Sequence, residues 1–271
     1  MSECTYGLAK RLQFVSELIT RLEPQKILDV GCGTGDNLTQ QLAKMFPEYR
    51  FVGIDSDMAS INYANSRRTT ENIEFFVADE QAQLGRFDLV IASEVIEHVE
   101  SPTVFLEFLT NSVEKDGNII LTLPNGFGPF ECAAMLEAFL HFIGVLAVVR
   151  FFKRLIVVSL PKNQFNDTLA ISPHINFFSY SKFNTLITDC GFRVGKYQAR
   201  TFLCGFGFDH LIKSEQILSW NAKVAGRLPP QFVSAWMFLL IPPDRFVSCE
   251  AKASLFSRFR RYINEVRWGL R

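Results

Sequence analysis

A short run of closely spaced glycines constrains this chain more than any other feature. A buried apolar strand over residues 26–30 leads into the turn Gly31-Cys32-Gly33-Thr34-Gly35, and a helix is expected over 38–46. Glycine lacks Cβ, so the backbone can adopt positive φ and come close to a bound molecule. The free N–H groups at the start of the helix point at the same place. The turn therefore predicts a ligand site at the end of the first strand.

An acidic residue ends the second strand and indicates what the ligand is. This strand, over 51–54, is followed by Asp55, which is placed to accept hydrogen bonds from both hydroxyls of a ribose. A dinucleotide fingerprint would need glycine or alanine where Asp36 stands, and a carboxylate there would repel a pyrophosphate but suit a cationic ligand. The chain also lacks a P-loop run. The ligand is therefore expected to be a nucleoside without a pyrophosphate.

These motifs resemble those of the class I S-adenosylmethionine-dependent methyltransferases. The first reads Leu28-Asp29-Val30-Gly31-Cys32-Gly33-Thr34-Gly35, and the resemblance continues in order through Asp55, Ala78-Asp79, 87–90 and 119–124. The run Ser-Glu-Val-Ile-Glu-His-Val at 93–99 resembles ubiquinone-pathway O-methyltransferases and related small-molecule methyltransferases.

The resemblance implies S-adenosylmethionine as the cofactor. Asp29 and the Gly31 backbone would face its amino acid end, Asp55 its ribose, and Asp79 the exocyclic amine of adenine. Alternatively, Asp79 only ends a strand or caps a helix. The expected cofactor-binding residues are Asp29, Gly31, Gly33, Gly35, Asp55, Ser56, Asp79 and Ser93.

Strand and helix patterns alternate as in βαβ units. The expected fold is α/β, with a doubly wound, seven-stranded, mostly parallel sheet of the Rossmann-like methyltransferase type and a helical apolar insertion after strand five. We treat 1–271 as one domain. It comprises a cofactor-binding core over 26–124, an apolar insertion or lid over 125–173, and a C-terminal part over 174–271 that completes the sheet.

Further elements are expected outside the cofactor-binding core. An amphipathic helix over 6–22 is expected to cover the sheet edge or part of the pocket. The last strands are expected over 192–198 and 234–241 as an antiparallel hairpin, with a helical insertion over 209–226. The basic tail over 252–271 predicts a solvated helix.

The apolar insertion allows two interpretations. Its uninterrupted part, 142–149, is far below the roughly 20 residues that a membrane-spanning helix needs. The insertion would form a lid over the active site, or an interfacial helix with Arg150, Lys153 and Arg154 toward lipid phosphates. The second interpretation predicts peripheral membrane contact through 133–160.

Composition narrows the choice of partners and compartment. Lys plus Arg and Asp plus Glu number 28 each, and this zero net charge argues against a nucleic-acid substrate. The six cysteines form no Cys-x-x-Cys pair or zinc array, so reduced, mostly buried thiols of a cytosolic protein are expected. No signal peptide is recognised. A cytoplasmic location is expected, membrane-associated if the interfacial interpretation holds. The oligomeric state is not predicted.

Three residues are candidates for catalysis: Glu94, His98 and His174. Methyl transfer from a sulfonium is an in-line displacement, so the remaining chemistry is removal of a proton from the acceptor. His98 follows strand four and titrates near neutrality, but it would equally shape the first turn of a helix. His174 returns from the insertion to the sheet edge, where it is a second base or only holds the loop.

A metal is not expected from the sequence. Glu94, Glu97 and His98 offer ligand atoms, but no Asp-Asp or Asp-Asn pair stands at a recognisable spacing.

The predicted function is methyl transfer from S-adenosylmethionine to a small-molecule or lipid-linked acceptor, at oxygen in preference to nitrogen or carbon. The phenylalanine-rich insertion favours an apolar or aromatic acceptor. Three alternatives remain. One is a methyltransferase of a soluble sugar or natural product with the insertion as lid only, and another is a catalytically inactive cofactor-binding partner protein. The third is a dehydrogenase, which would bind a nicotinamide dinucleotide.

Overall fold

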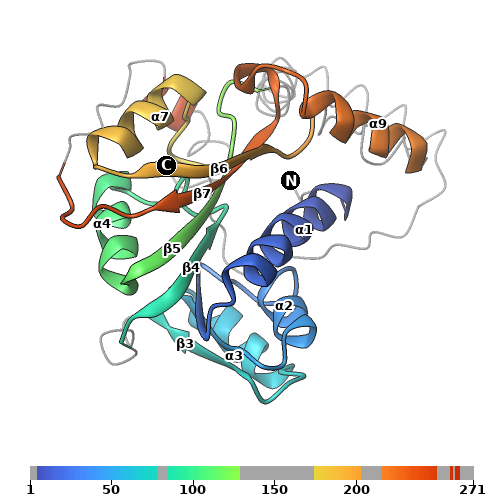
Figure 1. Ribbon diagram of the computed structural model, residues 1–271, viewed down its shortest axis with the longest axis vertical. Helices are drawn as coiled ribbons and strands as arrows, with labels where there is room; N and C mark the ends of the chain where they lie inside the picture. Colours follow the sequence, from blue (N-terminus) through green and yellow to red (C-terminus); the bar gives the residue numbers. More distant parts are fainter. Residues whose placement is uncertain are drawn as a thin grey trace.

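The computed structural model describes residues 5–78, 85–128, 174–202, 215–248, 257–258 and 260–262. Within these ranges seven strands form one sheet in the order β3-β2-β1-β4-β5-β7-β6 (Figure 1). The strands are β1 (Lys26–Val30), β2 (Arg50–Asp55), β3 (Ile73–Val77), β4 (Phe87–Ser93), β5 (Val113–Pro124), β6 (Arg193–Ala199) and β7 (Ala235–Ile241). The helices are α1 (Thr5–Leu22), α2 (Thr39–Met45), α3 (Met58–Ser66), α4 (Pro102–Ser112), α7 (Tyr180–Asp189), α9 (Glu215–Ala225) and the 3-10 helix η2 (Pro230–Phe232).

Strand order and direction confirm the expected doubly wound fold. Strands β1 to β5 are parallel, and β7 runs antiparallel between β5 and β6. The chain moves outward from β1 through β2 to β3, and then returns to the other side of β1 with β4. Ligands of open α/β sheets bind at the carboxyl ends of the strands where the order reverses. The glycine turn after β1 and the loop after β4 meet at this point.

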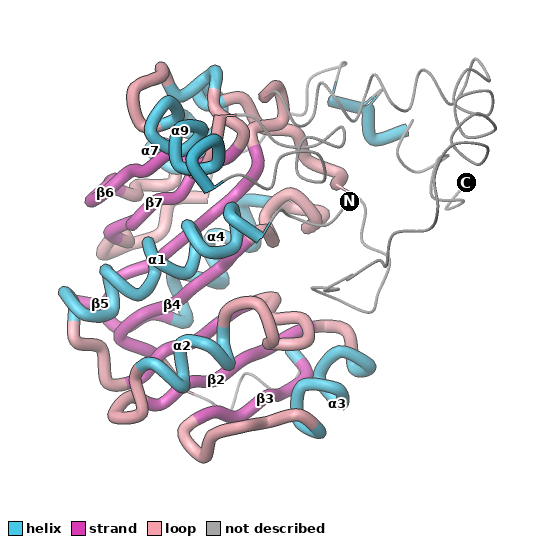
Figure 2. The backbone as a smooth tube through the Cα atoms, turned by 90° about the vertical axis from the view of Figure 1, so that its right-hand side faces the viewer, coloured by secondary structure: helices cyan, strands magenta, loops and turns pink. Residues whose placement is uncertain are grey.

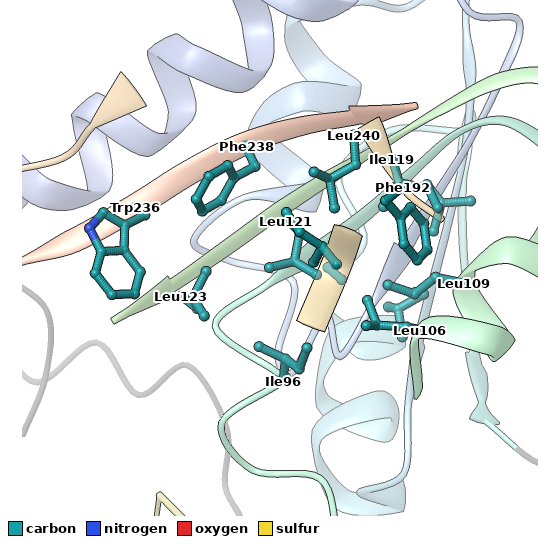
Figure 3. Close-up of a cluster of buried hydrophobic side chains, with 14 of the residues drawn as sticks. Ile96, Leu106, Leu109, Ile119, Leu121, Leu123, Phe192, Trp236, Phe238 and Leu240 are labelled. Atoms are coloured by element: carbon teal, nitrogen blue, oxygen red, sulfur yellow. The ribbon is translucent and has the colours of Figure 1, made fainter. Parts of the chain in front are cut away.

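Two buried clusters cover the two faces of the sheet. Neighbouring residues of a strand point to opposite faces, so Ile27 and Leu28 belong to different clusters, as do Ile120 and Leu121. One cluster joins the sheet to α4 and α7. Figure 3 shows part of this cluster, with Leu106 of α4 and with Leu121 and Phe238 of the neighbouring strands β5 and β7. The other joins it to α1, α2 and α3. Figure 2 shows α1 lying across the strands.

Side-chain caps explain where three helices begin. Asp57 accepts hydrogen bonds from the N–H groups of Ala59 and Ser60 at the start of α3. Ser101 caps α4, which has proline at its first turn, and Ser179 caps α7. These polar side chains satisfy N–H groups that have no partner inside the helix.

Some expectations differ from the structure or lie outside the described residues. The prediction that the tail over 252–271 is solvated is wrong at Arg260, which is 4% exposed. Cys32 is a free thiol, but Cys190 is disulfide-bonded, which contradicts uniformly reduced cysteines. Asp79 and residues 129–173, nearly all of the apolar insertion, are not described. Among the helices that are described, none combines the length and apolar character needed to cross a membrane.

Candidate functional site

The glycine turn between β1 and α2 forms the first half of the site. Gly31, Gly33 and Gly35 have φ of +72°, +55° and +72°, a left-handed region that other residues rarely adopt. A Cβ on Gly31 would lie 2.4 Å from Cγ2 of Val95, and one on Gly35 would lie 2.7 Å from Cζ of Phe75. Backbone conformation and packing therefore both require glycine at these two positions. Through Val95 the turn also contacts the loop that follows β4.

Asp55 lies at the end of β2, where the glycine turn orients its carboxylate. The N–H of Gly33 donates a hydrogen bond to Oδ2 at 2.8 Å, and the N–H of Asp57 donates to Oδ1 at 2.8 Å. Each carboxylate oxygen can still accept a further hydrogen bond. Ser56, the next residue, is exposed, and its assignment to the cofactor stays a prediction.

Asp29 is a buried carboxyl group with an unpartnered oxygen. Its side chain is on β1, and the residue is 3% exposed. The Thr39 hydroxyl donates to Oδ2 at 2.5 Å, whereas Oδ1 has no hydrogen-bond partner among the described residues. Burial raises the pKa of Asp29 to about 6, against the Thr39 hydrogen bond and the Arg11 charge, while the Asp55 charge adds to the rise. A cationic ligand group would compensate the buried carboxylate.

The second half of the site begins where β4 ends. The hydroxyl groups of Ser93 and Thr122 are hydrogen-bonded at 2.9 Å. Glu94 then adopts a left-handed φ of +58°, unusual outside glycine and often found at functional sites. The Thr122 hydroxyl donates to Oε1 of Glu94 at 2.8 Å, and the Arg200 guanidinium donates to Oε2 at 3.2 Å. Burial opposes ionisation of Glu94, but the Arg200 and Arg11 charges prevail and lower its pKa. Glu94 is therefore held as a carboxylate.

Glu97, His98 and His174 form a cluster beside Glu94. Their ligand atoms all lie within 4.8 Å of one another. Nε2 of His98 is 3.9 Å from Oε1 of Glu97, and the rings of His98 and His174 meet edge to face with centroids 4.9 Å apart. The structure thus brings both predicted histidines into one place, together with a carboxyl group. We call Glu97, His98 and His174 the acceptor-side cluster.

Glu97 is the most perturbed member of the acceptor-side cluster. It is 1% exposed, and neither carboxyl oxygen has a hydrogen-bond partner within the described residues. Burial, helped by the negative charge of Glu94, raises its pKa to about 8, and the charge of His174 opposes this. Leaving such a group unpartnered is unfavourable. Two imidazoles and a carboxylate also suit a divalent transition metal, so the acceptor-side cluster could hold a cation.

Hydrogen bonds between segment 174–178 and the loop after β4 place His174 beside His98. The N–H groups of Ile175 and Asn176 both donate to the carbonyl oxygen of Glu97 at 2.9 Å. The Asn176 side chain donates to the carbonyl oxygen of Val99 at 2.6 Å. Segment 174–178 is thus tied to the loop after β4, on which His98 lies.

Two arginines of the site, Arg11 and Arg200, were not predicted from the sequence. Arg11 is 4% exposed and its charge acts on both Asp29 and Glu94. It stands in the apolar stripe of α1, and a basic residue in such a stripe is a usable signal. Arg200 follows β6, and no local pattern pairs it with Glu94.

Comparisons with known proteins agree with this architecture. The sequence model of a family described as "Methyltransferase domain" matches residues 3–196. A malonyl-[acyl-carrier protein] O-methyltransferase of Acetivibrio thermocellus is 38% identical over 93 residues, which are 34% of this chain and 32% of that protein. A ubiquinone biosynthesis O-methyltransferase of Acinetobacter baylyi is 31% identical over 122 residues, 42% of this chain and 50% of that protein. The chain therefore spans only a third to a half of the length of these two relatives.

A solved structure shares the fold. The plantazolicin methyltransferase BpumL, in complex with a triazolic desmethylPZN analog and SAH, aligns with a TM-score of 0.50 and 18% identity. The alignment covers 89% of this chain and 86% of that one.

Proposed function

Since this chain belongs to the methyltransferase domain family, we propose that it transfers the methyl group of S-adenosylmethionine to an oxygen of a small-molecule acceptor. The observation that carries the proposal is the buried Oδ1 of Asp29, which lies beside the positive-φ glycine turn and has no hydrogen-bond partner in the part of the chain that the structure describes. The ammonium group of the cofactor would supply the missing charge. The relatives named O-methyltransferases support oxygen as the atom methylated.

The residues of the turn fit the cofactor. Asp29 would bind its ammonium group, and Asp55, already oriented by Gly33, would accept hydrogen bonds from the ribose hydroxyls. Ser56, Ser93 and Asp79 complete the proposed set. When bound, S-adenosylmethionine supplies a methyl group already activated by the positive charge on sulfur.

We propose that Glu94 and the acceptor-side cluster bind the hydroxyl group of the methyl acceptor and remove its proton. His98 and His174 are the candidate bases, because their rings lie together at the carboxyl ends of the strands, beside Glu94. Glu94 is held ionised by Arg200, so it orients donors on the acceptor and carries no proton to give. Positioning the acceptor against the methyl group would supply much of the rate.

We further propose a divalent cation on the acceptor-side cluster. Neither oxygen of buried Glu97 has a hydrogen-bond partner among the described residues, and the contact of Oε1 with Nε2 of His98 is long at 3.9 Å. A cation would compensate this carboxylate, which favours the proposal. No metal is expected from the spacing of Glu94, Glu97 and His98 in the sequence; His174 adds a ligand atom to this group. A cation there would lower the pKa of a bound hydroxyl group, and the two histidines would then be its ligands in place of acting as bases.

The acceptor is proposed to be apolar or aromatic, and lipid-linked if the insertion contacts membranes. This part rests on the apolar character of residues 133–160 in the sequence. Partition of the purified protein with liposomes distinguishes a lipid-facing insertion from a lid, because a protein with only a lid stays in solution.

Calorimetry with S-adenosylhomocysteine tests the cofactor half. We expect Asp55→Ala to weaken binding by at least about tenfold, since it removes charged hydrogen bonds to the ribose. Asp55→Asn keeps one carbonyl oxygen as an acceptor and should weaken the affinity for S-adenosylhomocysteine by less. Asp116→Ala, an exposed carboxylate at the start of β5, is the matched control. Wild-type affinity in Asp55→Ala would contradict the proposed site.

Transfer of a labelled methyl group tests turnover. The protein is incubated with methyl-labelled S-adenosylmethionine and a small-molecule extract, and label in the extracted products is counted. His174→Asn should reduce transfer by roughly a hundredfold, the scale of a lost general base, with unchanged affinity for S-adenosylhomocysteine. If the protein binds the cofactor but no extracted product carries label, the alternative of a catalytically inactive cofactor-binding protein is favoured.

A further inference from the structure

The C-terminal helical segment reaches the acceptor side through Arg260. Of this segment the structure describes residues 257–258 and 260–262. Arg260 is 4% exposed, and its guanidinium donates a hydrogen bond to the carbonyl oxygen of Gly126. Its Cζ lies 3.9 Å from the ring centroid of Phe177 and 5.8 Å from that of Phe127. A cation over a buried aromatic face is attracted by the ring and shielded from water.

The groups that Arg260 contacts belong to two loops of the site. Gly126 and Phe127 follow β5, whereas Phe177 belongs to segment 174–178. The two loops touch directly, because the N–H of Gly126 donates to the carbonyl oxygen of Phe178 at 2.8 Å. A Cβ on Gly126 would lie only 2.8 Å from the backbone of Phe177. Arg260 thus spans a tight junction between the end of β5 and the segment that carries His174.

The neighbouring Arg261 fastens the same segment to a third loop. Its guanidinium forms a two-pronged ion pair with Glu100, with nitrogen to oxygen distances of 2.8 to 3.1 Å. Glu100 closes the loop after β4 that also holds Glu97 and His98. The Glu100 side chain is 77% exposed, so solvent weakens this pair. The buried contact of Arg260 is therefore the stronger restraint.

We propose that Arg260 is a positioning residue that completes the acceptor half of the site. It acts through Phe177, whose ring centroid lies 6.5 Å from that of His174. By pressing Phe177 against the loop after β5, Arg260 keeps His174 next to His98 and Glu97. The C-terminal segment is then a part of the acceptor site, contributed from the far end of the chain. This inference rests on the proposed function of the acceptor-side cluster.

Hydrogen exchange measured by mass spectrometry tests the positioning directly. In Arg260→Ala, the Ile175 and Asn176 amides should exchange faster by about tenfold or more, because their bonds to Glu97 open more often. Peptides from β1 and β4 should exchange as in the wild type. Arg260→Lys keeps the charge over Phe177 and should restore part of the protection. Arg258→Ala, an exposed arginine of the same segment, is the matched control and should change nothing.

Cobalt binding gives a second readout. Titration of the full chain with Co²⁺ alone, followed by visible absorption, should show an affinity in Arg260→Ala about tenfold below that of the wild type, the usual scale for an outer support of a metal site. Affinity for S-adenosylhomocysteine should stay unchanged. If the wild type binds no Co²⁺, the proposed cation fails while the exchange measurement still decides the role of Arg260.

Three outcomes would overturn the positioning role. The first is unchanged exchange of the amides of residues 175 and 176 in Arg260→Ala. The second is an equal rise in exchange across β1 and β4, which would mean general loss of stability. The third is the same effect in Arg258→Ala. Should Arg260→Ala fail to fold, Arg260→Lys decides, with a smaller rise confined to the peptide over 174–179.

Discussion

His98 and His174 meet edge to face, with ring centroids 4.9 Å apart and ring planes at 71°. They come from either side of the apolar insertion, and the carboxyl group of Glu97 lies beside them. The loop after β4 supplies one histidine, and segment 174–178 supplies the other. The acceptor half of the site is therefore a product of tertiary contacts, and it can be tested separately from the cofactor half.

A cation on the acceptor-side cluster predicts a measurable metal site. Protein stripped with a chelator should bind one equivalent of Co²⁺. His174→Asn removes a ligand and should weaken this binding by more than the roughly ten- to hundredfold that loss of an outer-shell partner costs. Glu107→Gln removes an exposed acid of α4 and should bind Co²⁺ as the wild type does. Visible absorption measures both. Equal affinity in His174→Asn and the wild type would exclude a cation held by these three residues.

Cofactor binding should depend on pH through Asp29. Burial raises its pKa to about 6 in the free protein, and the ammonium group of the ligand requires the ionised form. Affinity for S-adenosylhomocysteine should be constant above pH 6 and fall below it, approaching about tenfold per pH unit because a proton must then be released on binding. Asp29→Asn should bind weakly, without this dependence. Calorimetry between pH 5 and 8 measures it, and a flat wild-type profile would contradict the role of Asp29.

Glu97 should make metal-free protein less stable as pH rises. The ordinary pKa of a glutamic acid is about 4.5, and burial together with the Glu94 charge raises the pKa of Glu97 to about 8 in the folded state. Between these values the folded state binds a proton that the unfolded state lacks. The free energy of unfolding should fall with rising pH, with a limiting slope of about 1.4 kcal/mol per unit for one proton.

Urea unfolding at several pH values, in a chelator, measures this dependence. Glu97→Gln carries no titrating proton at this position and should flatten the slope, whereas Glu107→Gln should leave it as in the wild type. A wild-type slope that survives Glu97→Gln would assign the pH dependence to another group.

Two glycines with the same backbone conformation should respond differently to alanine. Gly31 and Gly85 have φ of +72° and +75°, but only Gly31 has a neighbour, Val95, within 2.4 Å of the added Cβ. Gly85→Ala should cost about 1 to 2 kcal/mol for the left-handed backbone alone. Gly31→Ala should cost about 1 to 3 kcal/mol more, because of the clash. Thermal unfolding measures both, and adding Val95→Ala should recover part of the Gly31→Ala loss. Equal losses at the two glycines would show that the loop after β4 moves away at no cost.

Local patterns in the sequence were enough to predict α1, α2, α9, the first two and the last two strands, and the glycine turn. Strand β5 begins well before the motif at 119–124, because Val113 pairs with Phe87 before the register shifts. Asp29, Gly31, Gly33, Gly35 and Asp55 lie on two consecutive strand ends, and the parallel pairing of β1 with β2 brings them together. This pairing follows from a single βαβ unit, whose handedness and direction are nearly invariant.

Local patterns could not predict burial and pairing on the acceptor side. No residue near Arg200 in the sequence indicates that it pairs with Glu94. The tail is rich in basic residues, which is typical of a solvated helix, so the burial of Arg260 over Phe177 could not be predicted from it. These contacts join residues more than eighty positions apart in the sequence. They exist only after the sheet order has placed β5, β7 and β6 side by side.

The sequence by itself determined the glycine turn, the acids at the strand ends and the alternation of apolar strands and helices, because backbone conformation and capping depend on a few neighbouring residues. The tertiary structure alone decided that Glu97 would be buried with no hydrogen-bond partner among the described residues, that His174 would meet His98, and that Arg260 would lie buried over Phe177. Burial sets the cost of a charge, and burial is a property of the packed chain.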